Sequence, residues 1–128
     1  MEEKMNKYDL EERLIAFAVL IVELVAEMPD SRIANHLAGQ LLRSGTSPAL
    51  NYGEAQASES RRDFIHKMKV ALKELRESNI CLKIIYRTHC YKSKDKVERA
   101  LTETSELVSI FVKSVKTAIQ NVAKASSN

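Results

Sequence analysis

The histidines are the first place to look for a metal site, because helical bundles often carry di-iron centres. Such a centre needs two inward-facing Glu-x-x-His motifs and two further Glu residues. No Glu stands three residues before any of the three histidines, His36, His66 and His89. Asp63 has this spacing from His66, but both fall on the outer side of their predicted helix. We therefore expect no metal and no cofactor.

Nucleophilic catalysis has little support either. Neither Cys81 nor Cys90 has a histidine placed in a helical frame to activate it, and the serines fall at expected turns and helix caps. With three Gly in the chain there is no glycine-rich phosphate loop. The sequence indicates a protein that is not an enzyme.

A basic stripe is a candidate for binding a nucleic acid. Six basic residues fall within about a third of the circumference of the predicted third helix, opposite the core or beside it: Arg62, Lys69, Lys73, Arg76, Lys83 and Arg87. Such a stripe could follow the phosphate backbone of RNA or DNA and release its counterions. A solvated face is the alternative, since Glu74 and Glu77 lie beside it and it lacks aromatic residues for base stacking.

A polar stripe occupies one side of the predicted second helix. Its residues recur at steps of three and four: His36, Gln40, Arg43, Ser47, Asn51, Glu54 and Ser58. Small residues lie beside it at 44–47, where two backbones can approach closely. Partly buried polar groups must find partners, so the stripe is either a solvated flank or a network that fixes helix register or a subunit contact. The candidate members of that network are Arg43, Ser47, Asn51, Glu54 and, on the third helix, Glu77.

Apolar periodicity predicts the helices that position these residues, at about 9–28, 32–57, 60–88 and 95–123. Asp9 with Glu12 fits a capping box for the first helix. Asp30 or Ser31 can cap the second helix, and Ser58 or Ser60 the third. Because short connectors join long helices, we expect a single all-α domain over residues 1–128, an antiparallel up-down four-helix bundle.

The second helix contains Gly45 and Pro48, which are poor residues for a helix interior. The apolar period continues in register on both sides of them. We therefore expect a kink near Pro48, with two helices joined by a short turn at 44–48 as the alternative.

The first helix is apolar on two sides. The stripe expected to face the core consists of Leu10, Leu14, Phe17, Ile21, Leu24 and Met28. The opposite side carries Ile15, Val19, Val22 and Ala26, and further apolar residues fall off the core at Ile80, Cys81, Ile84 and Ile110. Monomers rarely expose so much apolar surface. We therefore expect a homo-oligomer, with the second stripe of the first helix in its interface.

Charge and hydropathy add bounds on the partners. The formal charge of +3 permits an anionic partner without requiring one. The longest apolar run, at 14–26, is too short to span a bilayer and contains Glu23. The amino-terminal residues lack the pattern of a secretory signal. We expect a cytoplasmic protein with reduced cysteines and no membrane partner.

The segment RSGTSPALNYGE, from Arg43 to Glu54, resembles the second-helix signature of the small bacterial four-helix-bundle proteins encoded by intervening sequences in 23S rRNA genes. The segments DFIHKMKVA at 63–71, with Glu77, and SELVSIFVKSVK at 105–116 are similar to the third and last helices of that family. Two departures stand out. The chain has YGEA at 52–55 where the family usually has IAEG, and Lys73-Glu74 replaces a common Gly-Ser pair. The second departure resembles a free-standing subgroup, so a location inside a ribosomal RNA gene is not implied.

The resemblance implies a bundle that assembles into a ring, a homopentamer, and implies no known reaction. In architecture the chain is also similar to the basic, pentameric accessory proteins of diversity-generating reverse transcriptases, which bind nucleic acid. Because fold does not settle function, two hypotheses follow. One is a non-catalytic oligomeric bundle that binds RNA or DNA through the third helix. The other is a structural module whose ring docks a partner protein through the polar stripe of the second helix.

Overall fold

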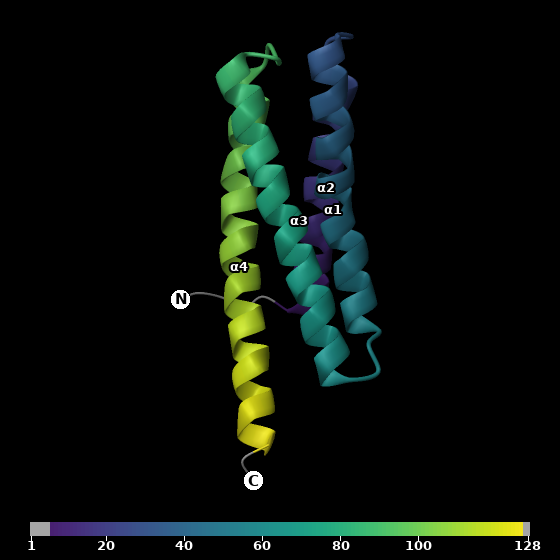
Figure 1. Ribbon diagram of the computed structural model, residues 1–128, viewed down its shortest axis with the longest axis vertical. Helices are drawn as coiled ribbons and strands as arrows, with labels where there is room; N and C mark the ends of the chain where they lie inside the picture. The colour runs from purple at the N-terminus through teal and green to yellow at the C-terminus, as the bar shows by residue number, and fades with distance from the viewer. Residues whose placement is uncertain (1–5, 127–128) are drawn as a thin grey trace.

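The computed structural model describes residues 6–126 and is built from four α-helices: α1 (Lys7–Ala26), α2 (Arg32–Gln56), α3 (Arg61–Thr88) and α4 (Lys94–Ser126). The helices lie side by side as a bundle, and the chain, followed by its colour, reverses direction at each connector (Figure 1). The described residues contain no strand. The predicted all-α bundle of four helices is confirmed.

Side-chain caps set where the helices begin. The side-chain oxygen of Asn6 accepts hydrogen bonds from the backbone N–H groups of Tyr8 and Asp9, at 2.9 and 3.0 Å. The carboxylate of Asp9 in turn accepts from the backbone N–H of Asn6. The prediction that Asp9 caps the first helix with Glu12 is therefore wrong: Asp9 is the third helical residue of a capping box that begins at Asn6. The predicted caps Ser31 and Ser60 are confirmed.

Helix α2 is continuous from Arg32 to Gln56 with Pro48 inside it. The alternative of two helices joined at 44–48 is wrong, and the kink near Pro48 stays a prediction. Close packing against α1 explains why glycine, a poor helix former, stands at position 45 in the middle of this helix. A Cβ atom added there would lie 2.7 Å from Cγ2 of Ile21. The absence of a side chain therefore lets α1 and α2 approach closely.

The core is mostly aliphatic and follows the predicted stripes of α1 and α2. In α1 the buried residues are Leu10, Leu14, Phe17, Ile21 and Leu24, whereas Met28, also expected in this stripe, lies beyond the end of α1 and is half-buried. The apolar spacing of α2 predicts seven core residues, and all are buried: Ala34, Leu37, Leu41, Gly45, Pro48, Tyr52 and Ala55. Cys81, expected off the core, is buried, and its thiol donates to the carbonyl of Leu37. Ile110 is half-buried against the core.

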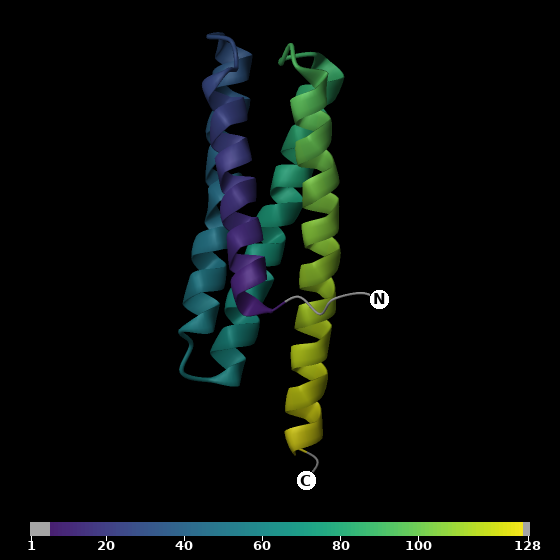
Figure 2. The same cartoon turned by 180° about the vertical axis from the view of Figure 1, so that it is seen from behind.

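The far end of α4 also departs from the prediction. The apolar spacing of α4 continues through Ile119 and Val122 and predicts that both face the core. In the structure they are 44% and 37% exposed. In Figures 1 and 2 the last part of α4 extends beyond the connector between α2 and α3, so no neighbouring helix is there to cover it.

The four helices of the bundle do not pack equally closely against one another. Helix α2 packs on both α1 and α3, and α3 also packs on α4, whereas the contact between α1 and α4 is small. Helices α1 and α3 are diagonal neighbours without close backbone contact. Their outer faces therefore lie on opposite sides of the molecule. No described helix combines the length and the hydropathy that a membrane crossing needs.

Candidate nucleic-acid interface

Helix α3 presents the six predicted basic residues on one outward face. On a helix of 3.6 residues per turn their positions fall within about 80° of one another, opposite the buried residues Ala71, Leu75 and Leu82. All six side chains are exposed, and none forms an ion pair with another described residue: Arg62, Lys69, Lys73, Arg76, Lys83 and Arg87. The stripe extends over about 37 Å at roughly 1.5 Å per residue.

The two acids beside the stripe, Glu74 and Glu77, form ion pairs with a residue of α2. Arg43 of α2 forms ion pairs with Glu74 and Glu77 of α3, at 3.0 and 3.1 Å. The hydrogen bond from Arg43 lowers the pKa of Glu77 below its usual value, and the charge of Lys73 in the stripe acts in the same direction. Glu74 is buried and Glu77 half-buried on the side of α3 that faces α2. The presence of Glu74 and Glu77 beside the stripe therefore supports a solvated face less than the sequence alone suggested.

The polar stripe of α2 is only partly a network. Arg43 crosses to α3 as described, and Glu54 forms an ion pair with Lys67 of α3 at 2.9 Å. Ser47 instead donates to the carbonyl of Arg43 in its own helix. The side chain of Asn51 forms no hydrogen bond with any described residue, so the structure does not bring it into the network. Docking of a partner protein on this stripe stays a prediction.

Sequence reasoning missed three members of the contact between α2 and α3, which are Ser44, Glu74 and Ser78. The hydroxyl groups of Ser44 and Ser78 are hydrogen-bonded at 2.9 Å, and both residues are buried. Glu74 is the buried partner of Arg43. The available signal was the spacing of Glu74 and Ser78 by one helical turn, which puts them on the same side of α3.

Apolar side chains interrupt the basic face. Ile80 and Ile84 are 60% and 43% exposed. Ile80 borders two shallow hollows of about 330 and 360 Å³, one against α2 and one against α4. Ile80 falls within the arc of the basic side chains and Ile84 just beside it. A purely solvated helix face would not be expected to carry two large aliphatic residues there.

The outer side of α1 is exposed as well. Ile15, Val19 and Val22 are 43%, 50% and 47% exposed, and Ala26 is exposed beside them. These are the residues assigned to an oligomer interface from the sequence. Their exposure is consistent with that role, and the homo-oligomer stays a prediction.

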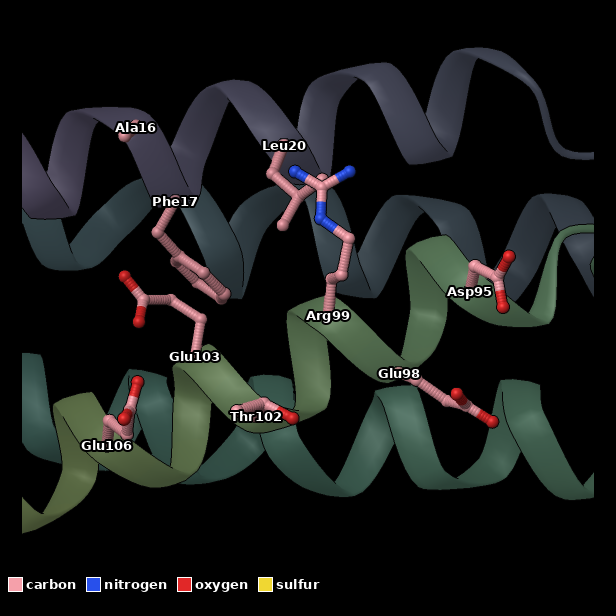
Figure 3. Close-up of a pocket in the computed structure, with 9 residues that line it drawn as sticks. All are labelled: Ala16, Phe17, Leu20, Asp95, Glu98, Arg99, Thr102, Glu103 and Glu106. Atoms are coloured by element: carbon pink, nitrogen blue, oxygen red, sulfur yellow. The ribbon is translucent and has the colours of Figure 1, made fainter.

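A hollow of about 660 Å³ lies where α1 and α4 separate (Figure 3). Phe17 and Leu20 line it from α1, and the other wall consists of acidic side chains of α4 together with Arg99, which extends toward Leu20. Just beyond it, Arg13 bridges the helices to Glu103 and Glu106, at 2.7 and 2.8 Å. The hydrogen bond to Glu103 raises the pKa of Arg13. We interpret this cluster as one of the contacts that hold α1 to α4, together with the ion pair between Lys96 and Glu27.

The residues considered for metal chemistry do not gather. All three histidines are exposed. Among residues 6–126, no three His, Cys, Asp or Glu side chains lie together as a metal site would require. Burial raises the pKa of the Cys81 thiol, which makes that cysteine a poor nucleophile.

Comparison with a family model and with solved structures gives results that agree with each other. The family described as 23S rRNA-intervening sequence protein matches residues 6–113. The crystal structure of a protein with unknown function from the S23 ribosomal protein family of Bacteroides thetaiotaomicron VPI-5482 is similar, with a TM-score of 0.79 and 31% identity. The similarity covers 88% of this chain and 99% of that one. No curated protein matches. The family match includes all of α1, α2 and α3 and ends within α4.

Proposed function

This chain belongs to the 23S rRNA-intervening sequence protein family, and on that premise we propose that it is a non-catalytic, self-associating bundle that binds RNA or DNA. The contact runs along α3 and is made to the phosphate backbone. The single observation that carries the proposal is the row of six exposed basic side chains on the outer face of α3, none of them ion-paired to a described residue. The solved relative is itself described as a protein with unknown function.

The chemistry of the stripe suits phosphate better than bases. Exposed Lys and Arg side chains, spaced by one or two helical turns, can each meet a phosphate and release its counterions. Between them stand aliphatic residues, Ile80 and Ile84, and aliphatic side chains offer no hydrogen bonds to base edges and no ring for base stacking. We therefore expect affinity without strong sequence preference.

A charge reversal tests this proposal. Lys69→Glu with Lys73→Glu places two negative charges in the middle of the stripe, and we expect the Kd for a labelled RNA hairpin to rise by at least roughly tenfold at low salt. Fluorescence anisotropy with the hairpin and with a DNA duplex of equal length measures this and separates the two nucleic acids.

The matched control reverses the same charges on α4. Lys113→Glu with Lys116→Glu changes two exposed lysines that form no ion pair with a described residue. We expect this variant to bind nearly as the wild type does. Absence of binding by the wild-type protein at low salt, or equal losses in both variants, contradicts the proposal.

A further inference from the structure

The two hollows beside Ile80 differ in charge. The hollow between α2 and α3 has Arg43 and Glu77 in its lining, and these two side chains form an ion pair with each other. The hollow between α3 and α4 has Arg76 as the one charged residue among its described lining residues. Arg76 forms no ion pair with a described residue. Of the two, the α3–α4 hollow therefore presents a positive charge that is free to meet an anion.

The size and the lining of the α3–α4 hollow suit a single nucleobase. Its volume is about 360 Å³, at the lower end of the roughly 300–1,000 Å³ of small-ligand sites. Ile80 and Val108 supply aliphatic walls, and Asn79 and Ser105 supply polar groups beside them. The planar guanidinium of Arg76 can lie against the face of a base. The hollow thus offers apolar contact, a stacking plane and a few polar groups.

Asn79 offers this hollow a hydrogen-bond acceptor. The hydroxyl of Thr104 donates its one hydrogen to a backbone carbonyl of its own helix, so its oxygen accepts from Nδ2 of Asn79, at 2.9 Å. This contact fixes the orientation of the amide. The Oδ1 atom of Asn79 has no hydrogen bond with a described residue, and it is not among the buried polar atoms. It is therefore accessible to a donor on a ligand.

The hollow lies beside the basic stripe. Arg76 lines it, and Lys83 follows two helical turns later, about 10.5 Å along α3 at roughly 1.5 Å per residue, with Ile80 between them. We propose that these two cations bind the phosphates on either side of one unpaired nucleotide, while its base enters the α3–α4 hollow. This inference rests on the proposed function, since the stripe must hold the backbone for the base to reach the hollow.

The proposal predicts which nucleic acids bind best. A paired base cannot enter the hollow without leaving its stack and its partner, and this costs energy that an unpaired base does not spend. Loops and bulges should therefore bind more tightly than an uninterrupted duplex, which contacts the stripe through phosphates alone. Because Oδ1 of Asn79 needs a donor, a base with an exocyclic amino group, such as adenine, should be preferred over uracil at this one position.

A single bulged base tests the proposal. The probe is an RNA duplex with one adenine bulge, and the reference is the same duplex with an abasic nucleotide at the bulge, which keeps the number of phosphates equal. By fluorescence anisotropy, the Kd of the wild type for the abasic reference should be at least roughly fivefold higher. With 2-aminopurine at the bulge, the emission should shift to shorter wavelength on binding, because the base leaves water.

Filling each hollow in turn locates the base. Ser105→Leu adds an aliphatic side chain at the α3–α4 hollow, and Gln40→Leu is the matched control at the α2–α3 hollow; both residues are exposed. Ser105→Leu should bind the two RNAs equally, with the affinity of the wild type for the abasic reference, and should leave the emission unshifted. Gln40→Leu should behave as the wild type does. Circular dichroism verifies that each variant is folded.

Asn79→Ala tests the acceptor. The wild type should bind an adenine bulge more tightly than a uracil bulge, and the ratio of the two Kd values should approach one in this variant. A wild type that does not distinguish the two bulges contradicts the role of Asn79.

The outcomes separate this inference from the proposed function. Equal binding of the adenine and abasic bulges by the wild type overturns base binding while the proposed function stands. So does a preference that survives in Ser105→Leu or is lost in Gln40→Leu. A wild type that binds neither RNA at low salt contradicts the proposed function itself, and the inference fails with it.

Discussion

At the scale of single residues, Gly45 shows most clearly how one side chain controls the fold. Ile21 is fully buried, and its Cγ2 and Cγ1 atoms would lie 2.7 and 2.8 Å from a Cβ at position 45. A β-branched side chain inside a helix has little rotamer freedom with which to move away. The contact between α1 and α2 therefore depends on a missing side chain.

We expect Gly45→Ala to lower the free energy of unfolding by about 1–3 kcal/mol, because it overpacks this contact. Gly39→Ala is the matched control, since no atom lies within 4 Å of a Cβ added there. In the control the gain in helix propensity should raise the free energy of unfolding by up to about 1 kcal/mol. Urea denaturation measures both, and equal effects of the two substitutions would show that the close approach is not tight.

Tyr91 makes a second contact that can be tested by titration. It lies buried in the connector before α4 and donates its hydroxyl to Glu27, which also accepts from Lys96 at 2.7 Å. Burial, and then the hydrogen bond to Glu27, raise the pKa of Tyr91 to about 12. Because the folded pKa lies above the unfolded value of about 10, the contact stabilises the protein fully below pH 10 and is lost as pH rises toward 12.

The Tyr91→Phe variant should therefore be less stable than the wild type at neutral pH, and the difference should shrink between about pH 10 and 12. Urea denaturation at a series of pH values measures it. Tyr8→Phe, at an exposed tyrosine, is the control. A difference between wild type and Tyr91→Phe that stays constant through the alkaline range would contradict the assignment.

At the scale of the elements, much of the fold could be predicted from the sequence because apolar periodicity states which side of a helix is buried. It identified the buried stripes of α1 and α2. It could not state how far neighbouring helices extend, so Ile119 and Val122 were assigned to a core that ends before them. Cys81 lies at the edge of the α3 stripe, where periodicity alone does not decide between burial and exposure.

The α2–α3 contact allows a prediction at this scale. Arg43→Ala leaves the buried Glu74 without its cation, and we expect it to lower the urea midpoint at neutral pH. The pKa of Glu77 is lowered in the folded protein. The stabilisation by its ion pair with Arg43 is therefore present above the pKa of Glu77 in the unfolded chain, near 4.3. It is lost as pH falls through the pKa of the folded protein. The difference from the wild type should therefore decrease below about pH 4.

Arg32→Ala is the control for that experiment, because Arg32 is exposed at the start of α2 and forms no ion pair with a described residue. Equal loss in both arginine variants would mean that the contact with α3 contributes nothing specific.

At the scale of the whole molecule, the arrangement of charge matters more than the net value of +3. Both candidate surfaces could be identified residue by residue from the sequence. Their relation to each other could not, because it depends on which helices are adjacent and which are diagonal. The structure places the exposed apolar residues of α1 and the basic stripe of α3 on opposite sides of the bundle. One surface is thereby available to a partner when the other is engaged.

The salt dependence of nucleic-acid binding tests the central claim most directly. If all six basic residues of α3 contact phosphates of a duplex, the slope of log K against log salt concentration should approach about −5. Lys69→Ala with Lys73→Ala should reduce its magnitude by roughly 2, whereas Lys113→Ala with Lys116→Ala should leave it unchanged. A slope near zero, or a slope that the first variant does not alter, would contradict binding along α3.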